Sequence, residues 1–221
     1  MEIGLIFLAL ILASLIGWLL KQSLNTQPWV AEAADGVEAA RYQAPFNARP
    51  KVVALTTLLA VITSFFALVV SAYSLRMELG DWVPLTEPQL LWTNTVILAL
   101  ASVAFQWTRS SARSGNEQRI KTGLVVTGVL TTAFLVGQFI AWQQLSAAGH
   151  YVTSNPADAF FYLLTGVHAL HIMGGMYVWF RATLRAFSGG DSVEESVQLC
   201  AVYWHFLLVV WLVLFGLMLS T

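Results

Sequence analysis

Long apolar runs dominate the chain and are separated by short polar connections. A helix needs about 20 mostly apolar residues to cross the hydrocarbon core of a bilayer. Six runs have this length, at about 3–20, 52–75, 91–108, 122–145, 159–181 and 197–219. The pattern therefore predicts an all-α, polytopic membrane protein with six transmembrane helices arranged as a bundle.

The spacing of the runs predicts three parts. An N-terminal transmembrane helix occupies residues 1–21, a cytoplasmic loop follows over 22–51, and a five-helix bundle takes up 52–221. The first run begins with Met-Glu and is followed, not preceded, by Lys21, which is opposite to the charge bias of a signal peptide. We therefore expect the first run to remain as a membrane helix.

Lysine and arginine are concentrated in every second connection. Loops rich in these residues stay on the cytoplasmic side of a membrane. The basic residues of the first, third and fifth connections are Lys21, Arg41, Arg49, Lys51, Arg109, Arg113, Arg119, Lys121, Arg181 and Arg185. The second connection has only Arg76, and the fourth has none. This alternation predicts that both termini lie outside.

Composition excludes several classes of protein. Hydrophobic residues make up 57% of the chain and charged residues 10%, against roughly a quarter in soluble domains. The net charge of −1 offers no basic surface for nucleic acid. The single cysteine, Cys200, excludes an intrachain disulfide and any multi-cysteine metal site.

None of the 12 acidic residues lies near the middle of a run, which argues against proton translocation through this chain alone. The candidate groups inside the membrane are His168, His171 and His205, whereas His150 falls in a loop and is interpreted as solvated. Facing histidines could bind haem, with His168 or His171 opposite His205. We favour the alternative that each imidazole bonds a neighbouring hydroxyl, carbonyl or subunit.

The nearby hydroxyl groups that could form hydrogen bonds with those imidazoles belong to Tyr162, Thr165 and Tyr203. No carboxylate or thiol stands near the histidines to complete a metal shell, so we predict no metal site. Tryptophans near the ends of the runs are interpreted as anchors in the headgroup region. They are Trp29, Trp82, Trp92, Trp107 and Trp179.

Four motifs in order resemble subunit III of the haem–copper oxidases, the cytochrome c oxidase family. They are NTVILALASVAFQW, FLVGQFIAW, FFYLLTGVHALHIMGG and AVYWHFLLVVW, and the likeness covers about residues 52–219. The resemblance implies a helical bundle with a lipid-holding cleft, docked on a catalytic subunit I and associated with subunit II. It implies no catalytic residue, haem or copper in this chain; the haem and copper belong to the partner subunits.

The resemblance further implies a supporting role in aerobic respiration. Such a subunit stabilises the oxidase, sustains its proton uptake and gives oxygen and lipid access, in a bacterial-type inner membrane. The residues that match signature positions are expected to bind lipid or pack helices, and they are His168, His171, Arg185, Trp204 and His205. An accessory subunit of a nitric oxide reductase and a haem-binding membrane cytochrome are the alternatives.

Three carboxylates typical of the family are missing. Ile62 or Thr63 stands where a glutamate is common, Ala141 follows the G-Q motif in place of another, and Leu208 replaces an aspartate. Roles that depend on those acids are therefore not expected here. Neither the electron donor of the complex, cytochrome c or quinol, nor the packing of the first helix follows from the sequence.

Overall fold

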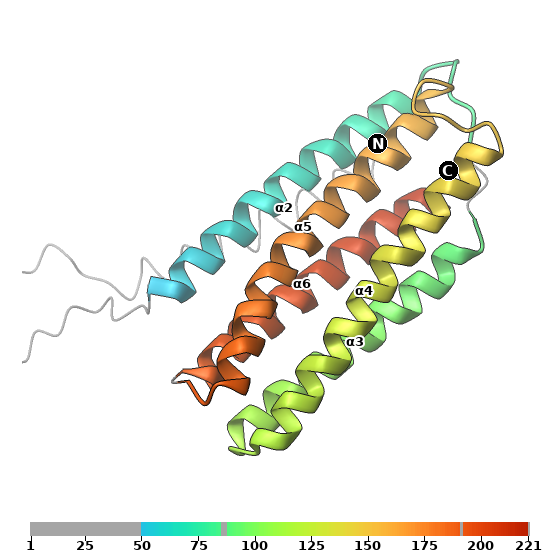
Figure 1. The fold of residues 1–221 in the computed structure, drawn as a ribbon. Coiled ribbons are helices and arrows are strands. Elements are labelled where there is room, and N and C mark those ends of the chain that lie inside the picture. The colour runs from blue at the N-terminus through green and yellow to red at the C-terminus, as the bar shows by residue number, and fades with distance from the viewer. Residues whose placement is uncertain (1–49, 85–87, 191, 221) are drawn as a thin grey trace, which may run out of the picture. The chain divides into compact units, whose positions relative to one another are not determined.

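The computed structural model describes residues 50–84, 88–190 and 192–220. Every regular element among them is a helix, and each is long and apolar enough to cross a membrane (Figure 1). The helices are α2 (Pro50–Met77), α3 (Leu90–Arg113), α4 (Glu117–Ala147), α5 (Pro156–Phe187) and α6 (Val193–Leu219). The all-α prediction and the five-helix block are confirmed for these residues.

The predicted helix at 1–21 and the predicted loop at 22–51 lie outside the described residues, apart from the start of α2. The orientation of the termini therefore stays a prediction. Residues 50–71 of α2 belong to one compact unit and residues 72–220 to another, and each unit is described by itself.

The helices are longer than the apolar runs that predicted them. The charged connection expected over 109–121 is helical almost throughout, because α3 ends at Arg113 and α4 begins at Glu117. Backbone hydrogen bonding continues into the aqueous zone, where charged side chains are solvated and do not interrupt a helix. The same extension places Arg181 and Arg185 on α5 rather than in a loop, so this part of the prediction was wrong.

Asparagine side chains cap the N-termini of two of the helices. The Asn116 carboxamide accepts a hydrogen bond from the Arg119 amide at the start of α4. The Asn155 carboxamide accepts one from the Ala157 amide at the start of α5, where Pro156 occupies the first helical position. A proline there loses no intrahelical bond, so the Asn-Pro pair suits the start of α5.

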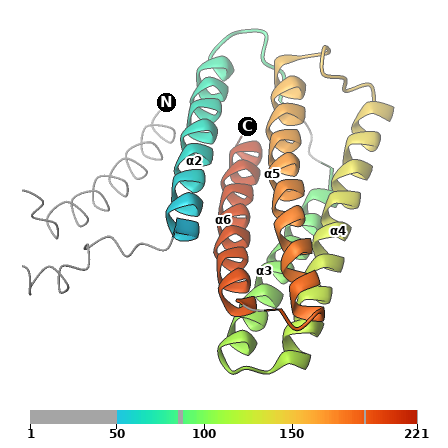
Figure 2. The same ribbon diagram turned by 60° about the vertical axis from the view of Figure 1, so that its left-hand side comes forward.

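Four helices form a closed ring (Figure 2). Helix α3 packs against α4 and α6, and α5 packs against the same two helices. Consecutive helices run in opposite directions, as their short connections require. The buried side chains face the middle of this ring, and the outward faces carry exposed leucine, valine and phenylalanine, as expected for lipid contact.

Glycines let neighbouring helices approach closely. A Cβ atom at Gly137 of α4 would lie 2.1 Å from Oδ1 of Asn94 on α3. A Cβ atom at Gly128 would lie 2.2 Å from the Trp179 ring of α5, whose Nε1–H donates to the Leu124 carbonyl at 3.0 Å. Small residues at such contacts are typical of membrane bundles. Trp179 therefore packs against α4, and its interpretation as a headgroup anchor stays a prediction.

Candidate functional site

His168 lies in the centre of the four-helix ring. Its side chain is fully buried, with its ring 6.1 Å from the Phe134 ring of α4 and 5.2 Å from the Trp211 ring of α6. Neither ring nitrogen has a hydrogen-bond partner among the described residues. Within the described residues this imidazole contacts aromatic rings and bonds no hydroxyl or carbonyl, so of the predicted partners only a neighbouring subunit stays a prediction.

His171 is only partly buried, although it follows His168 by less than one turn. Its Nδ1 atom is 2.8 Å from the Val167 carbonyl of its own helix, as predicted for a backbone-bonded imidazole. The Tyr203 hydroxyl of α6 donates to the His171 carbonyl at 3.0 Å. The two histidines of the α5 motif therefore occupy different environments.

Trp204 and His205 of the YWHF motif point to different neighbours. The indole Nε1–H of Trp204 crosses the ring and donates to the Thr131 hydroxyl of α4 at 3.1 Å. The His205 ring bonds two side chains of α3, the Ser102 hydroxyl at Nδ1 and the Gln106 carboxamide oxygen at Nε2, the latter at 3.1 Å. Both signature residues thus join helices within the bundle.

The haem alternative requires His168 or His171 to face His205. Instead, His205 directs both nitrogens toward α3, and His168 packs against Phe134 and Trp211. Among the described residues, no group of three or more histidine, cysteine, aspartate or glutamate side chains could hold a metal ion. The arrangement favours helix packing over cofactor ligation.

Arg185 lies on the last turns of α5, and its side chain is exposed. One guanidinium N–H donates to the Ser196 hydroxyl of α6 at 3.3 Å. The rest of this planar cation is presented at a helix end. A guanidinium in such a place matches the bidentate geometry of a phosphate group.

The positions that lack the family's carboxylates are ordinary helix positions. Ala141 is fully buried in α4, and Leu208 is partly exposed on α6. In α2, the Thr63 hydroxyl donates to the Leu59 carbonyl one turn earlier, at 2.7 Å.

Two further buried polar residues were missed as site candidates. Asn94 of α3 and Gln138 of α4 are almost completely buried, and their side-chain nitrogen and oxygen atoms have no hydrogen-bond partner among the described residues. Grouping them with His168 requires the register between three helices, which no local sequence pattern gives. We call Asn94, Gln138 and His168 the core polar cluster.

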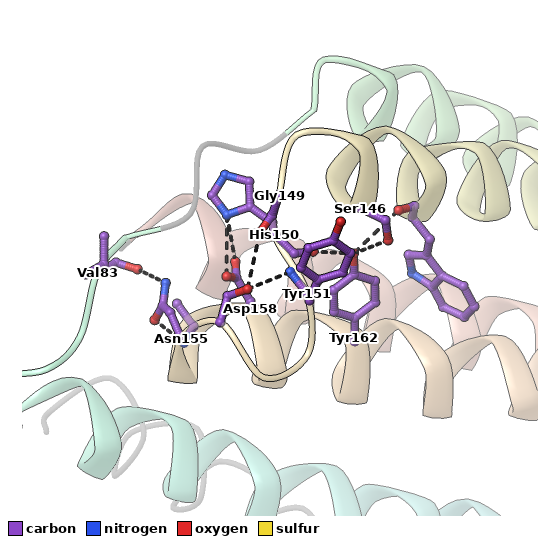
Figure 3. Close-up of polar contacts among 11 residues, drawn as sticks. Val83, Ser146, Gly149, His150, Tyr151, Asn155, Asp158 and Tyr162 are labelled. Carbon is purple, nitrogen blue, oxygen red and sulfur yellow. Dashed lines mark hydrogen bonds and ion pairs between the residues drawn. The ribbon is translucent and has the colours of Figure 1, made fainter.

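A second polar cluster lies where α4 turns into α5 (Figure 3). Asp158 in the first turn of α5 is 1% exposed, and its Oδ1 atom is 3.2 Å from Nδ1 of His150. The Tyr162 hydroxyl donates to the His150 carbonyl at 2.9 Å. His150 is therefore a paired, partly buried residue, and its interpretation as simply solvated was wrong.

Asn155 ties this turn to the connection that leads from α2. Its Nδ2–H donates to the Val83 carbonyl at 2.9 Å, while its Oδ1 caps α5 (Figure 3). We call His150, Asn155, Asp158 and Tyr162 the turn cluster. The sequence carried a signal for it, because Asn-Pro followed by an acidic residue is typical of a helix start. The cluster fixes loops and shows no nucleophile or cofactor cradle.

Known proteins resemble the chain along most of its length. The family described as Cytochrome c oxidase subunit III matches residues 4–220, which includes the N-terminal stretch that the motifs did not reach. The probable cytochrome c oxidase subunit 3 of Mycobacterium leprae is 30% identical over 177 residues, covering 76% of this chain and 87% of that protein.

Two further relatives come from Synechocystis sp. and Arabidopsis thaliana. Cytochrome c oxidase subunit 3 of Synechocystis sp. is 27% identical over 165 residues, covering 72% of this chain and 70% of that protein. Cytochrome c oxidase subunit 3 of Arabidopsis thaliana is 30% identical over 159 residues, covering 68% of this chain and 59% of that protein. The chain therefore belongs to the cytochrome c oxidase subunit III family and is a multi-pass membrane subunit of a haem–copper oxidase complex.

Proposed function

We propose that this chain is a non-catalytic supporting subunit, which docks on catalytic subunit I, with subunit II in the same complex. In this role it stabilises the oxidase, sustains proton uptake by subunit I and gives oxygen and lipid access to it. The complex lies in a bacterial-type inner membrane. Haem and copper are carried by the partner subunits.

The observation that carries the proposal is the use of the YWHF motif for packing. Trp204 and His205 direct their polar atoms to hydroxyl and carboxamide groups of α3 and α4. A ligand histidine needs one nitrogen for the metal. The geometry supports a role in holding the bundle rather than in electron transfer.

Affinity purification of the complex through a tag on this chain tests the partners. We expect mass spectrometry to identify a haem–copper catalytic subunit and a subunit II among the co-purifying proteins. Recovery with a nitric oxide reductase catalytic subunit, or with no haem–copper protein, would contradict the proposal.

Bound phospholipid is the second part of the proposal. The exposed Arg185 guanidinium at the end of α5 suits a lipid phosphate. Arg181 offers a matched control, since it is an exposed arginine of the same helix one turn earlier. We expect Arg185→Ala to lower the phospholipid retained per purified complex and Arg181→Ala to change it less. Equal retention in both variants would refute the assignment to Arg185.

A further inference from the structure

We propose that the core polar cluster of Asn94, Gln138 and His168 is a binding site for internal water inside the transmembrane bundle. The site lies within this chain and does not depend on the identity of the partner subunits.

Contacts between neighbouring helices place the three residues at one level of the ring. On α4, Gln138 lies one turn after Phe134, which packs on His168, and one turn before Trp142. The Trp142 indole donates to the Thr165 hydroxyl of α5 at 3.0 Å, and Thr165 precedes His168 by one turn. Gln138 therefore lies on α4 between two residues that both contact the same turn of α5.

Asn94 reaches this level from α3. Its Oδ1 atom lies against the backbone of Gly137, the residue before Gln138. The next residue on α3, Thr95, accepts a hydrogen bond at 2.9 Å from the Trp211 indole, whose ring packs on His168. Asn94 and Gln138 are thus joined through α4, and Asn94 and His168 through Trp211.

All six side-chain nitrogen and oxygen atoms of the cluster are buried without a partner among the described residues. A buried polar atom without a hydrogen bond costs free energy comparable to a lost bond, and hydrocarbon supplies no partner. Among the described residues, no backbone carbonyl bonds any of these three side chains, although the Val167 carbonyl bonds His171 on the same helix. The atoms therefore require a bound hydrogen-bonding molecule.

The chemistry of the six atoms selects water. The two carboxamides and one neutral imidazole present both N–H donors and acceptors, and a molecule that donates and accepts equally matches this mixture. A metal ion is a poor fit, because the cluster has no carboxylate or thiolate. A bound ion of either sign would be buried in the membrane without a countercharge among these side chains. Internal waters in proteins typically bond about three such groups each.

Cryo-electron microscopy of the intact oxidase complex, at a resolution that shows ordered water, tests the proposal. We expect water density within hydrogen-bond distance of at least two of the three side chains. Direct bonds among Asn94, Gln138 and His168 with no water between them would overturn it, as would an ordered metal ion at the site. The wild-type map is sufficient, so the test does not depend on a variant that folds.

A pair of substitutions on α4 sharpens the result. Gln138→Met keeps the length of the side chain but removes its polar atoms, and we expect the water density to weaken or disappear. Gln143→Met makes the same change at an exposed position of the same helix, and should leave the density intact. Unchanged density in Gln138→Met would show that Gln138 is not part of the site.

Discussion

The turn cluster is partly buried and the core polar cluster fully buried; both contain a histidine, but their hydrogen bonding differs. At the α4–α5 turn, His150 pairs with Asp158, and Tyr162 and Asn155 donate to backbone carbonyls. In the core polar cluster, the side-chain polar atoms have no partner among the described residues.

The difference follows from what the backbone offers at each place. A turn leaves carbonyls such as those of Val83 and His150 outside helix hydrogen bonding, so nearby side chains can use them. In the middle of a transmembrane helix, each carbonyl already accepts a helix hydrogen bond, and only a side chain within reach can add a second one, as His171 does at Val167. Polar side chains out of such reach need one another, a hydroxyl or a bound molecule. The His205 ring hydrogen-bonds Ser102 and Gln106 on α3, whereas the His168 ring contacts only aromatic rings.

Gly137→Ala should have the largest effect, because it breaks the core polar cluster. The new Cβ would lie 2.1 Å from Oδ1 of Asn94, so the carboxamide or the α3–α4 contact must shift. Overpacking of this kind costs about 3 kcal/mol at its upper end. Thermal unfolding of the purified complex, followed by tryptophan fluorescence, measures the loss.

Gly174→Ala is the control for that substitution. A Cβ at this helical glycine of α5 meets nothing within 4 Å, so the helix should gain up to about 1 kcal/mol from the better propensity of alanine. Equal destabilisation by both substitutions would show that close packing against Asn94 is not what matters at Gly137.

Asp158→Ala should have the next largest effect, because it breaks the turn cluster. The substitution leaves His150 without its buried acceptor, at a cost of about 2 kcal/mol for a hydrogen bond to a charged group. Glu117→Ala is the matched control. Glu117 is also acidic and in the first turn of its helix, but its side chain is 82% exposed and pairs with Lys121 at 3.7 Å.

An exposed pair of that kind contributes about 0–1 kcal/mol. The same thermal measurement should therefore separate the two variants clearly. If Asp158→Ala destabilised the complex no more than Glu117→Ala, the hydrogen bonds of the turn cluster would contribute little to stability. The contrast between the two clusters would then not hold.

Asn155→Ala isolates the tie between the turn cluster and the connection from α2. It removes the cap of α5 and the bond to the Val83 carbonyl, whereas Asn116→Ala removes a cap of the same kind at α4. Loss of a cap costs about 1 kcal/mol. We expect Asn155→Ala to be the more destabilising of the two, and the excess in unfolding free energy measures the Val83 bond. No excess would mean that the bond does not hold the two connections together.

Asp81 provides the smallest expected effect, in a connection that is fully solvated. Its hydrogen bond from Arg76 holds the pKa of the carboxyl below the ordinary value of 3.8. A lowered pKa means that the pair stabilises the turn above the ordinary pKa, and that this stability is lost as the pH falls through the lowered value. Amide hydrogen exchange at Trp82, whose N–H bonds the Leu79 carbonyl, should speed up only in that acidic range. A change near neutral pH would contradict the assignment.

The sequence predicted the helices better than it predicted their contacts. Apolar run length is a local property, so the five described spans were found, although the helices extend into polar ends such as Arg113 and Glu117. Contacts depend on the register between distant helices. The pairing of Trp204 with Thr131, and the grouping of Asn94 with His168, could not be read from periodicity alone.

The histidines show the same difference between contacts within one helix and contacts between helices. The prediction that each imidazole bonds a neighbouring hydroxyl, carbonyl or subunit is confirmed for His171 and His205. For His168, no hydroxyl or carbonyl of the described residues does so, and a subunit partner stays a prediction. Bonding within one helix was predictable, because Val167 precedes His171 by one turn. The surroundings of His168 are supplied by α4 and α6, which no local pattern identifies.

The distribution of haem in the purified complex tests the central claim most directly. The test is to separate this chain from the complex in detergent and to measure the Soret absorbance of each fraction. The account predicts that all haem remains with the catalytic subunit and that the separated chain has no Soret band. A Soret band that travels with this chain, and disappears in His205→Ala, would contradict it.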